Sequence, residues 1–250
     1  MKQTLLAITA VCISVISFSQ SSAGILKEVS PAAGGFSAER LTRIDKLFQE
    51  YTDKKFIGGA SAIVVHNGVI VYYKAFGYND AATKKAQLKD DIFRIASQTK
   101  AITSVAVMML YEQGKFLLDD AVSQYIPEFK NPKVLDKFNE ADSSYTTVPA
   151  KREVTIRDLL THTSGIAYAQ IGSKESNAIY YKNGIVAGIG VDKIILGDKM
   201  KKLGAMPLFH QPGEKWTYGL NTDLLGYLVE VVSGMSLDEF FKKNIFQPYT

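Results

Sequence analysis

The amino-acid sequence predicts an α+β protein in which one helix and a β-hairpin precede a long helical region. Apolar residues recur at helical spacing from Ser37 to about Tyr51. Two β-rich runs then flank Asn67-Gly68, a strong signal for a two-residue hairpin turn. From Asp91 onward the apolar spacing is mainly helical. These three observations predict a sheet near the N-terminus and a helical lobe after it.

The hairpin, residues 60–77, has nearly continuous apolar runs where a half-exposed hairpin would alternate polar and apolar residues. Strands that are buried on both faces have this composition. A lone hairpin is also marginally stable at best in water. We therefore expect both faces of the hairpin to be covered, and the hairpin to belong to a larger antiparallel sheet with flanking helices.

Capping signals mark helix boundaries in the second part of the chain. Segments 155–158 and 236–239, with the sequences TIRD and SLDE, have the S/T-x-x-D/E pattern of a capping box. Another helix is expected to begin near 221–223 and to end at Gly234. The polar, Ser/Thr-rich stretch 139–153 is expected to be a flexible connection.

The N-terminal residues 1–24 predict a signal peptide, because one cation precedes a short apolar run and then small polar residues. The run is shorter than the ~20 residues that a spanning helix needs, so we expect no stable membrane anchor. Cys12 is the only cysteine and lies inside this segment, and Val11 before it does not suit a lipoprotein signal. A periplasmic or secreted protein without thiol chemistry is expected.

The remaining residues, 25–250, suit one domain with two lobes, which we expect to span 25–92 and 93–250. Loss of Lys2 with the signal peptide lowers the formal net charge from +4 to +3, and no basic stripe indicates nucleic acid. The three histidines, His66, His162 and His210, are too widely spaced to suggest a metal site. We expect no metal and no cofactor, and the sequence leaves the oligomeric state open.

Residues 93–110, FRIASQTKAITSVAVMML, break a local rule. The run from Ala101 to Leu110 predicts a helix that is buried on most sides, with Ser97 at its first turn. A serine at this place is usually an N-cap, and its usual partner three residues later is Glu or Gln. Lys100 stands there instead. A cation at the positive end of a helix is disfavoured by ~0.3–1 kcal/mol, so the presence of Lys100 here needs an explanation other than capping.

A serine and a lysine three residues apart on a helix share one face, so the amine can reach the hydroxyl. Burial and the positive helix end both favour neutral Lys100, which can accept a proton from Ser97 and make it a nucleophile. The alternative is an N-cap serine followed by a lysine that extends to water. The short S-x-x-K pattern does not by itself decide between them.

Three ordered segments carry a resemblance to a family. They are IFRIASQTK around Ser97, TIRDLLTHTSG at 155–165, and PGEKWTYGLNTDLLGYLVEVVSG at 212–234 with SLDEFFKKNIF behind it. Together, over roughly residues 37–248, they resemble the serine β-lactamase-related hydrolases: class C β-lactamases, D-Ala-D-Ala carboxypeptidases and related esterases. The resemblance implies a β-lactamase/transpeptidase-like fold, with an antiparallel sheet, flanking helices and an all-helical lobe.

The resemblance also implies roles for single residues. Ser97 would attack an acyl carbonyl, Lys100 would take its proton, and Tyr218, which matches the tyrosine of the family's Y-x-N motif, would relay protons. Packing beside Trp216 is the alternative reading of Tyr218. Trp216, Leu220 and Asn221 are the expected substrate-binding residues, and His162 belongs to a structural segment and receives no catalytic role. Because Leu220 stands where the motif has its amide, we expect esters or small peptides more than β-lactams.

A third motif of the family, a strand-borne K-T-G or H-x-G, has no match in this sequence. The chain stops at IFQPYT, where relatives continue, so the C-terminal strands of the sheet are expected to be missing. The sequence therefore predicts an exported serine hydrolase that acts on a small acyl substrate through an acyl-enzyme. Two alternatives stay open: a catalytically silent, penicillin-binding-like recognition protein, and an inactive truncated product.

Overall fold

The computed structural model describes residues 26–186 and 194–249. The chain divides into two compact units, one made of residues 1–94 with 249–250 and the other of residues 95–248. This boundary lies two residues after the one expected from sequence. The predicted signal peptide, 1–24, lies outside the described residues. Among the residues described, no helix is both long enough and apolar enough to cross a membrane.

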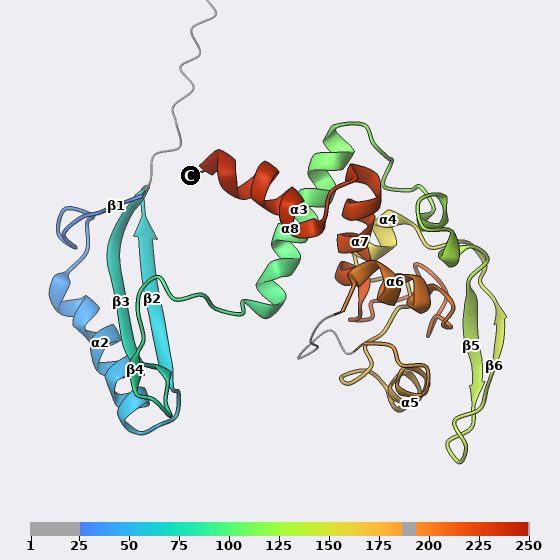
Figure 1. The fold of residues 1–250 in the computed structure, drawn as a ribbon, viewed down its shortest axis with the longest axis horizontal. Helices are drawn as coiled ribbons and strands as arrows, with labels where there is room; N and C mark the ends of the chain where they lie inside the picture. The colour runs from blue at the N-terminus through green and yellow to red at the C-terminus, as the bar shows by residue number, and fades with distance from the viewer. Residues whose placement is uncertain (1–25, 187–193, 250) are drawn as a thin grey trace, which may run out of the picture. The chain divides into compact units, whose positions relative to one another are not determined.

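The first unit is built on a sheet whose strands follow the order β1-β3-β2, with β4 paired to β3 (Figure 1). The strands span Lys27–Glu28 (β1), Gly59–His66 (β2), Val69–Asp80 (β3) and Lys85–Ala86 (β4). The predicted hairpin of β2 and β3 is confirmed, and Asn67 and Gly68 form its turn with φ of 47° and 76°. Both values suit a type I′ turn. The sequence predicted an antiparallel sheet. Because β1 runs parallel to β3, the sheet is mixed instead.

Helix α2, Ala38–Asp53, packs against β3 in the first unit. The Ser37 side chain caps it by accepting a hydrogen bond from the Arg40 N–H, and Phe48 stacks on Phe76 with ring centroids 5.3 Å apart. The other side of the hairpin keeps Ile63 51% exposed and Val65 44% exposed. Among the described residues α2 covers one face of the hairpin and the other stays exposed, as expected if the strands and helices that would cover it are missing from this chain.

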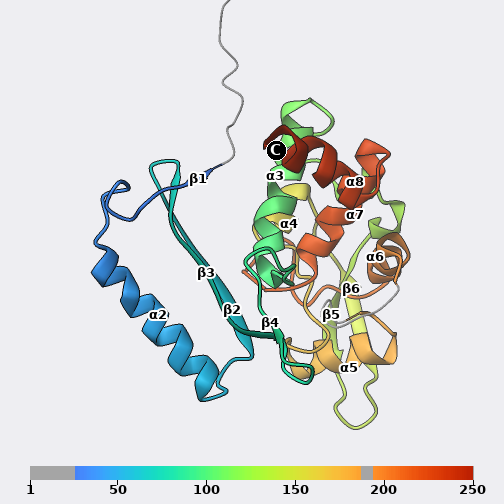
Figure 2. The ribbon, with the colours of Figure 1, turned by 60° about the vertical axis from the view of Figure 1, so that its left-hand side comes forward.

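The second unit is mostly helical, and α7 lies at its centre. Its elements are η1 (Ala96–Gln98), α3 (Thr99–Glu112), η2 (Val122–Gln124), η3 (Pro127–Phe129), α4 (Ile156–Leu160), α5 (Lys174–Lys182), α6 (Leu196–Gly204), α7 (Asn221–Ser233), α8 (Leu237–Phe241), the π-helical turn η4 (Lys242–Phe246) and η5, which begins at Gln247. Helix α7 packs against α3, α4, α6 and α8, and Figures 1 and 2 show it beside α3 and α4. Its buried side chains join those of α3 in one apolar core.

The predicted caps of the helical unit are confirmed. Thr155 with Asp158 and Ser236 with Glu239 form reciprocal capping boxes at the starts of α4 and α8. Gly234 ends α7 in the left-handed conformation, with φ of 72°. These local signals depend on neighbouring residues alone, which explains why the sequence revealed them.

Two segments of this unit differ from the prediction. Stretch 139–153 is not a simple connection, because β6 (Tyr145–Pro149) within it pairs with β5 (Lys133–Phe138). Helix α3 is buried on one side only: Ala106, Val107 and Leu110 are in the core, while Val105 is 50% exposed and Met108 39% exposed. The core of the second unit therefore buries only some of the apolar side chains of α3.

Candidate active site

Ser97 lies in the short η1 turn that leads into α3. The α3 helix begins at Thr99 and has Gln98 at its N-cap position, without a capping side chain. Ser97 is thus not the N-cap, and the ordinary capping explanation does not hold. Ala96, directly before it, has φ of 45°, in the left-handed region that non-glycine residues rarely adopt. This turn leaves Ser97 exposed to solvent, and such strained positions cluster at functional sites.

The three predicted catalytic residues meet. The Ser97 Oγ lies 2.9 Å from the Tyr218 hydroxyl, and the Lys100 Nζ lies 3.3 Å from the Ser97 Oγ. The Lys100 Nζ also lies 5.0 Å from the centroid of the Tyr218 ring. Ser97 comes from the turn before α3 and Tyr218 from the loop before α7, so two residues 121 positions apart in sequence share this hydrogen bond.

Lys100 and Tyr218 shift each other's pKa in opposite directions. Burial lowers the pKa of Lys100, but its interactions with the phenols of Tyr218 and Tyr168 outweigh burial and raise the pKa above its usual value. The same contact with Lys100, followed by that with Ser97, lowers the pKa of Tyr218. The structure thus favours a protonated lysine beside an easily ionised phenol. This differs from the neutral lysine predicted from the sequence, which considered burial and the helix end alone.

Tyr168 and Asp223 are two site residues that the sequence analysis missed. Tyr168 follows the HTSG segment, and its ring centroid lies 5.0 Å from that of Tyr218. Asp223, in the first turn of α7, interacts with both Tyr168 and Lys100 when ionised, while burial raises its own pKa. Tyr168 lies in none of the quoted catalytic patterns, and an acidic residue in a helix's first turn is ordinary. Only the tertiary structure brings them to the site.

Trp216 is the predicted substrate-binding residue that stays accessible. Its side chain is 65% exposed, and its ring stacks on Tyr218 with centroids 6.0 Å apart and planes 13° apart. The His162 ring lies 6.0 Å from Trp216 and 5.3 Å from Tyr218. The Tyr218 side chain therefore both contacts Ser97 and packs on Trp216.

Leu220 and Asn221 are completely buried, so the prediction that they contact substrate is wrong for this structure. The Asn221 amide instead bonds internally: it lies 3.0 Å from the His162 Nδ1 and accepts from the Ser164 hydroxyl. The reason is local, since both residues mark the start of α7 and point into its packed interior. Asn221 thus ties the HTSG segment to the loop that carries Tyr218.

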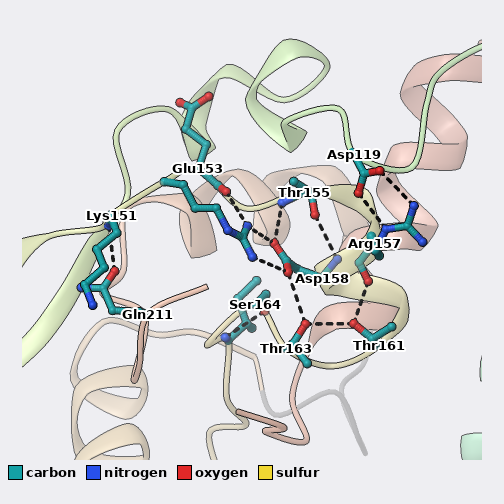
Figure 3. A network of polar contacts seen from close by, with 12 residues as sticks. Asp119, Lys151, Glu153, Thr155, Arg157, Asp158, Thr161, Thr163, Ser164 and Gln211 are labelled. Carbon is teal, nitrogen blue, oxygen red and sulfur yellow. Dashed lines mark hydrogen bonds and ion pairs between the residues drawn. The ribbon is translucent and has the colours of Figure 1, made fainter. Parts of the chain in front are cut away.

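A buried carboxylate, Asp158, also holds the HTSG segment through Thr163 (Figure 3). The Asp158 carboxylate accepts hydrogen bonds from both terminal guanidinium nitrogens of Arg152, from the Thr155 N–H and from the Thr163 hydroxyl. Burial raises the pKa of Asp158, but the Arg152 and Thr155 contacts outweigh it and hold the pKa below its usual value. The Gly213 N–H donates to the Thr163 carbonyl oxygen, which extends the network to the segment before Tyr218. The network therefore fixes the segment that carries His162 against the Tyr218 loop.

Comparisons with known proteins agree with this fold. Residues 44–250 match the β-lactamase family, so the chain belongs to that family. Esterase EstB of Burkholderia gladioli is 33% identical over 221 residues, which cover 88% of this chain and 53% of that protein. A putative D-alanyl-D-alanine carboxypeptidase of Escherichia coli K12 is 30% identical over 259 residues, covering 99% of this chain and 54% of the other.

Solved structures are also similar to this chain. EstCE1, described as a hydrolase with promiscuous acyltransferase activity, has a TM-score of 0.71 and 28% sequence identity, over 87% of this chain and 52% of its own. Simvastatin synthase LovD from Aspergillus terreus has a TM-score of 0.67 and 26% identity, over 84% and 51%. The predicted β-lactamase/transpeptidase-like fold is confirmed. The chain spans about half the length of these relatives.

Proposed function

We propose that this protein is an exported serine hydrolase that cleaves small esters through an acyl-enzyme on Ser97. One observation carries the proposal: the Ser97 Oγ lies within hydrogen-bond distance of both the Tyr218 hydroxyl and the Lys100 Nζ. A nucleophile beside a base that a third group orients is the signature of covalent catalysis. The names of the relatives, an esterase and a hydrolase with acyltransferase activity, support the same reaction class.

In the proposed reaction Lys100 and Tyr218 act together as the base. The Ser97 Oγ attacks the carbonyl carbon of the ester while its proton moves to the Tyr218 oxygen, whose charge the Lys100 ammonium stabilises. The carbon–oxygen bond to the leaving alcohol then breaks, and the alcohol takes the proton from Tyr218. A water attacks the acyl-enzyme next, gives its proton to Tyr218, and the proton returns to Ser97 as the carboxylic acid leaves.

This order revises the roles predicted from sequence. There, Lys100 was the proton acceptor and Tyr218 the relay. The raised pKa of Lys100 and the lowered pKa of Tyr218, both caused largely by their mutual contact, favour the phenol oxygen as the first acceptor. Lys100 then supplies charge and position.

A labelling experiment on the full chain tests the proposal. A fluorophosphonate should attach to Ser97 in peptide mass analysis, and Ser97→Ala should abolish both labelling and turnover of p-nitrophenyl esters. Lys100→Ala should slow acylation by ~10²–10⁴-fold. Ser104→Ala changes a serine inside α3 and should leave the rate unchanged. Adduct on a different serine would refute the assignment, and labelling without turnover would favour the silent recognition protein.

Ester preference is the finer part of the proposal. The loop has Leu220 where the Y-x-N motif has an amide, and both Leu220 and the next residue, Asn221, are buried, so neither offers an amide to a β-lactam side chain. We expect kcat/KM for short p-nitrophenyl esters to exceed that for penicillins and cephalosporins. A β-lactam preference of about tenfold, ~1.4 kcal/mol in transition-state free energy, would contradict this interpretation of the loop.

Export is proposed from the signal-peptide pattern of residues 1–24. Expression of the full gene with cell fractionation should place the protein in the periplasm or medium, with residues 1–24 absent from the mature mass. Retention in the cytoplasm at the full mass would contradict export and would leave the proposed chemistry untouched.

A further inference from the structure

Tyr168 faces the proposed base from the segment between α4 and α5. Its ring centroid lies 5.0 Å from that of Tyr218, with the two planes at 57°. The Lys100 Nζ lies 6.0 Å from the Tyr168 centroid and 5.0 Å from the Tyr218 centroid. Only 5% of Tyr168 is exposed. One ammonium therefore lies against two phenols, of which one reaches Ser97 and the other is enclosed by protein.

The surroundings of the two phenols shift their pKa values in opposite directions. Burial, followed by the negative charge of Asp223 on α7, raises the pKa of Tyr168, whereas contact with Lys100 on α3 lowers the pKa of Tyr218. His162, from the segment after α4, also faces Tyr218, and burial followed by the charge of Lys100 lowers its pKa, which favours neutral imidazole. Tyr168 thus keeps its proton under conditions in which Tyr218 ionises, and its hydroxyl can then donate to the Tyr218 oxygen.

We propose that Tyr168 is a positioning residue that donates a hydrogen bond to the Tyr218 oxygen and so holds Tyr218 in the form that accepts the Ser97 proton. Two observations support this contact: the two ring centroids lie 5.0 Å apart, and Tyr168 contributes to the lowered pKa of Tyr218. In this arrangement the Tyr218 oxygen accepts from the hydroxyls of Ser97 and Tyr168, and the Lys100 ammonium lies 5.0 Å from the centroid of its ring. Asp223 contributes by keeping the Tyr168 donor protonated.

This inference rests on the proposed function, and two measurements distinguish a failure of the inference from a failure of the proposed function. The first is the pH dependence of fluorophosphonate labelling at Ser97, whose acid limb reports the base. The second is the ultraviolet absorbance of tyrosinate, read as the difference between each protein and its Tyr218→Phe counterpart, which needs no activity. Loss of one hydrogen bond to a phenolate in Tyr168→Phe should move both midpoints to higher pH by about one unit.

Tyr180→Phe is the matched control. Tyr180 is a buried tyrosine whose hydroxyl accepts from the Ala167 N–H at 3.4 Å, so the variant loses a buried hydroxyl one residue from Tyr168. It should move neither midpoint. Tyr168→Met removes the same hydroxyl with a side chain that adapts to the space, and it replaces Tyr168→Phe if that variant fails to fold.

The outcomes are distinct. Unchanged midpoints in the folded Tyr168 variant, or an equal shift in Tyr180→Phe, would overturn the inference. A wild-type protein that does not label at Ser97 would overturn the proposed function, while a shift of the tyrosinate midpoint in Tyr168→Phe would still support the Tyr168 contact.

Discussion

Asp158→Asn should destabilise the helical unit by removing a buried charge that has four contacts. The Asp158 side chain is 6% exposed, and Arg152 opposite it is 45% exposed. Breaking a fully buried ion pair costs ~3–5 kcal/mol. Here the cation left behind reaches water and asparagine keeps the volume and one acceptor, so we expect a smaller loss of about 2 kcal/mol in the free energy of unfolding.

The effect should depend on pH in one direction. The folded-state pKa of Asp158 lies below its usual value, so its contribution is complete above the unfolded-state pKa of about 3.9 and is lost as pH falls through the folded value. The difference between wild type and Asp158→Asn should therefore shrink in acid. Urea unfolding followed by fluorescence measures it, because the single tryptophan, Trp216, lies in this unit.

Asp119→Asn provides the matched control. Asp119 pairs with Arg157 of α4, but the two side chains are 72% and 52% exposed. Exposed pairs contribute ~0–1 kcal/mol, so this variant should lose much less stability than Asp158→Asn. Equal losses in the two variants, or a loss from Asp158→Asn that is the same at neutral and acid pH, would refute the reasoning.

Three further predictions concern the loop of Tyr218 and the hairpin. In Gly219→Ala the new Cβ would lie 2.1 Å from the Ile166 carbonyl oxygen, so the loop must shift, and kcat/KM for ester hydrolysis should fall by about 10²-fold; an unchanged rate would contradict the tight contact. Asn221→Leu should lose about 2 kcal/mol in urea unfolding with KM unchanged, because its side chain bonds internally; a raised KM alone would restore its predicted contact with substrate. Gly68→Ala places a side chain at φ of 76° and should cost ~1–2 kcal/mol in the first unit, seen by circular dichroism, while the tryptophan transition stays in place.

Much of the local structure could be predicted because its causes are local. The capping boxes at 155–158 and 236–239, the turn at Asn67-Gly68 and the end of α7 at Gly234 each depend on a few adjacent residues. The short parallel strand β1 and the pairing of β5 with β6 were missed or wrongly assigned. Two-residue strands and polar strands have no periodicity to recognise, and a distant partner decides their pairing.

The candidate site likewise has features that the sequence determined and features that it did not. The sequence by itself determined that Ser97 and Lys100 share one side of a helical turn, because three residues of spacing are enough for that. Only the tertiary structure decided their chemistry. It brings Tyr218 to the serine, adds Tyr168 and Asp223 around the lysine, and buries Leu220 and Asn221 away from substrate. Ionisation follows the charges and solvent around a group in space, and residues far apart in the chain set both.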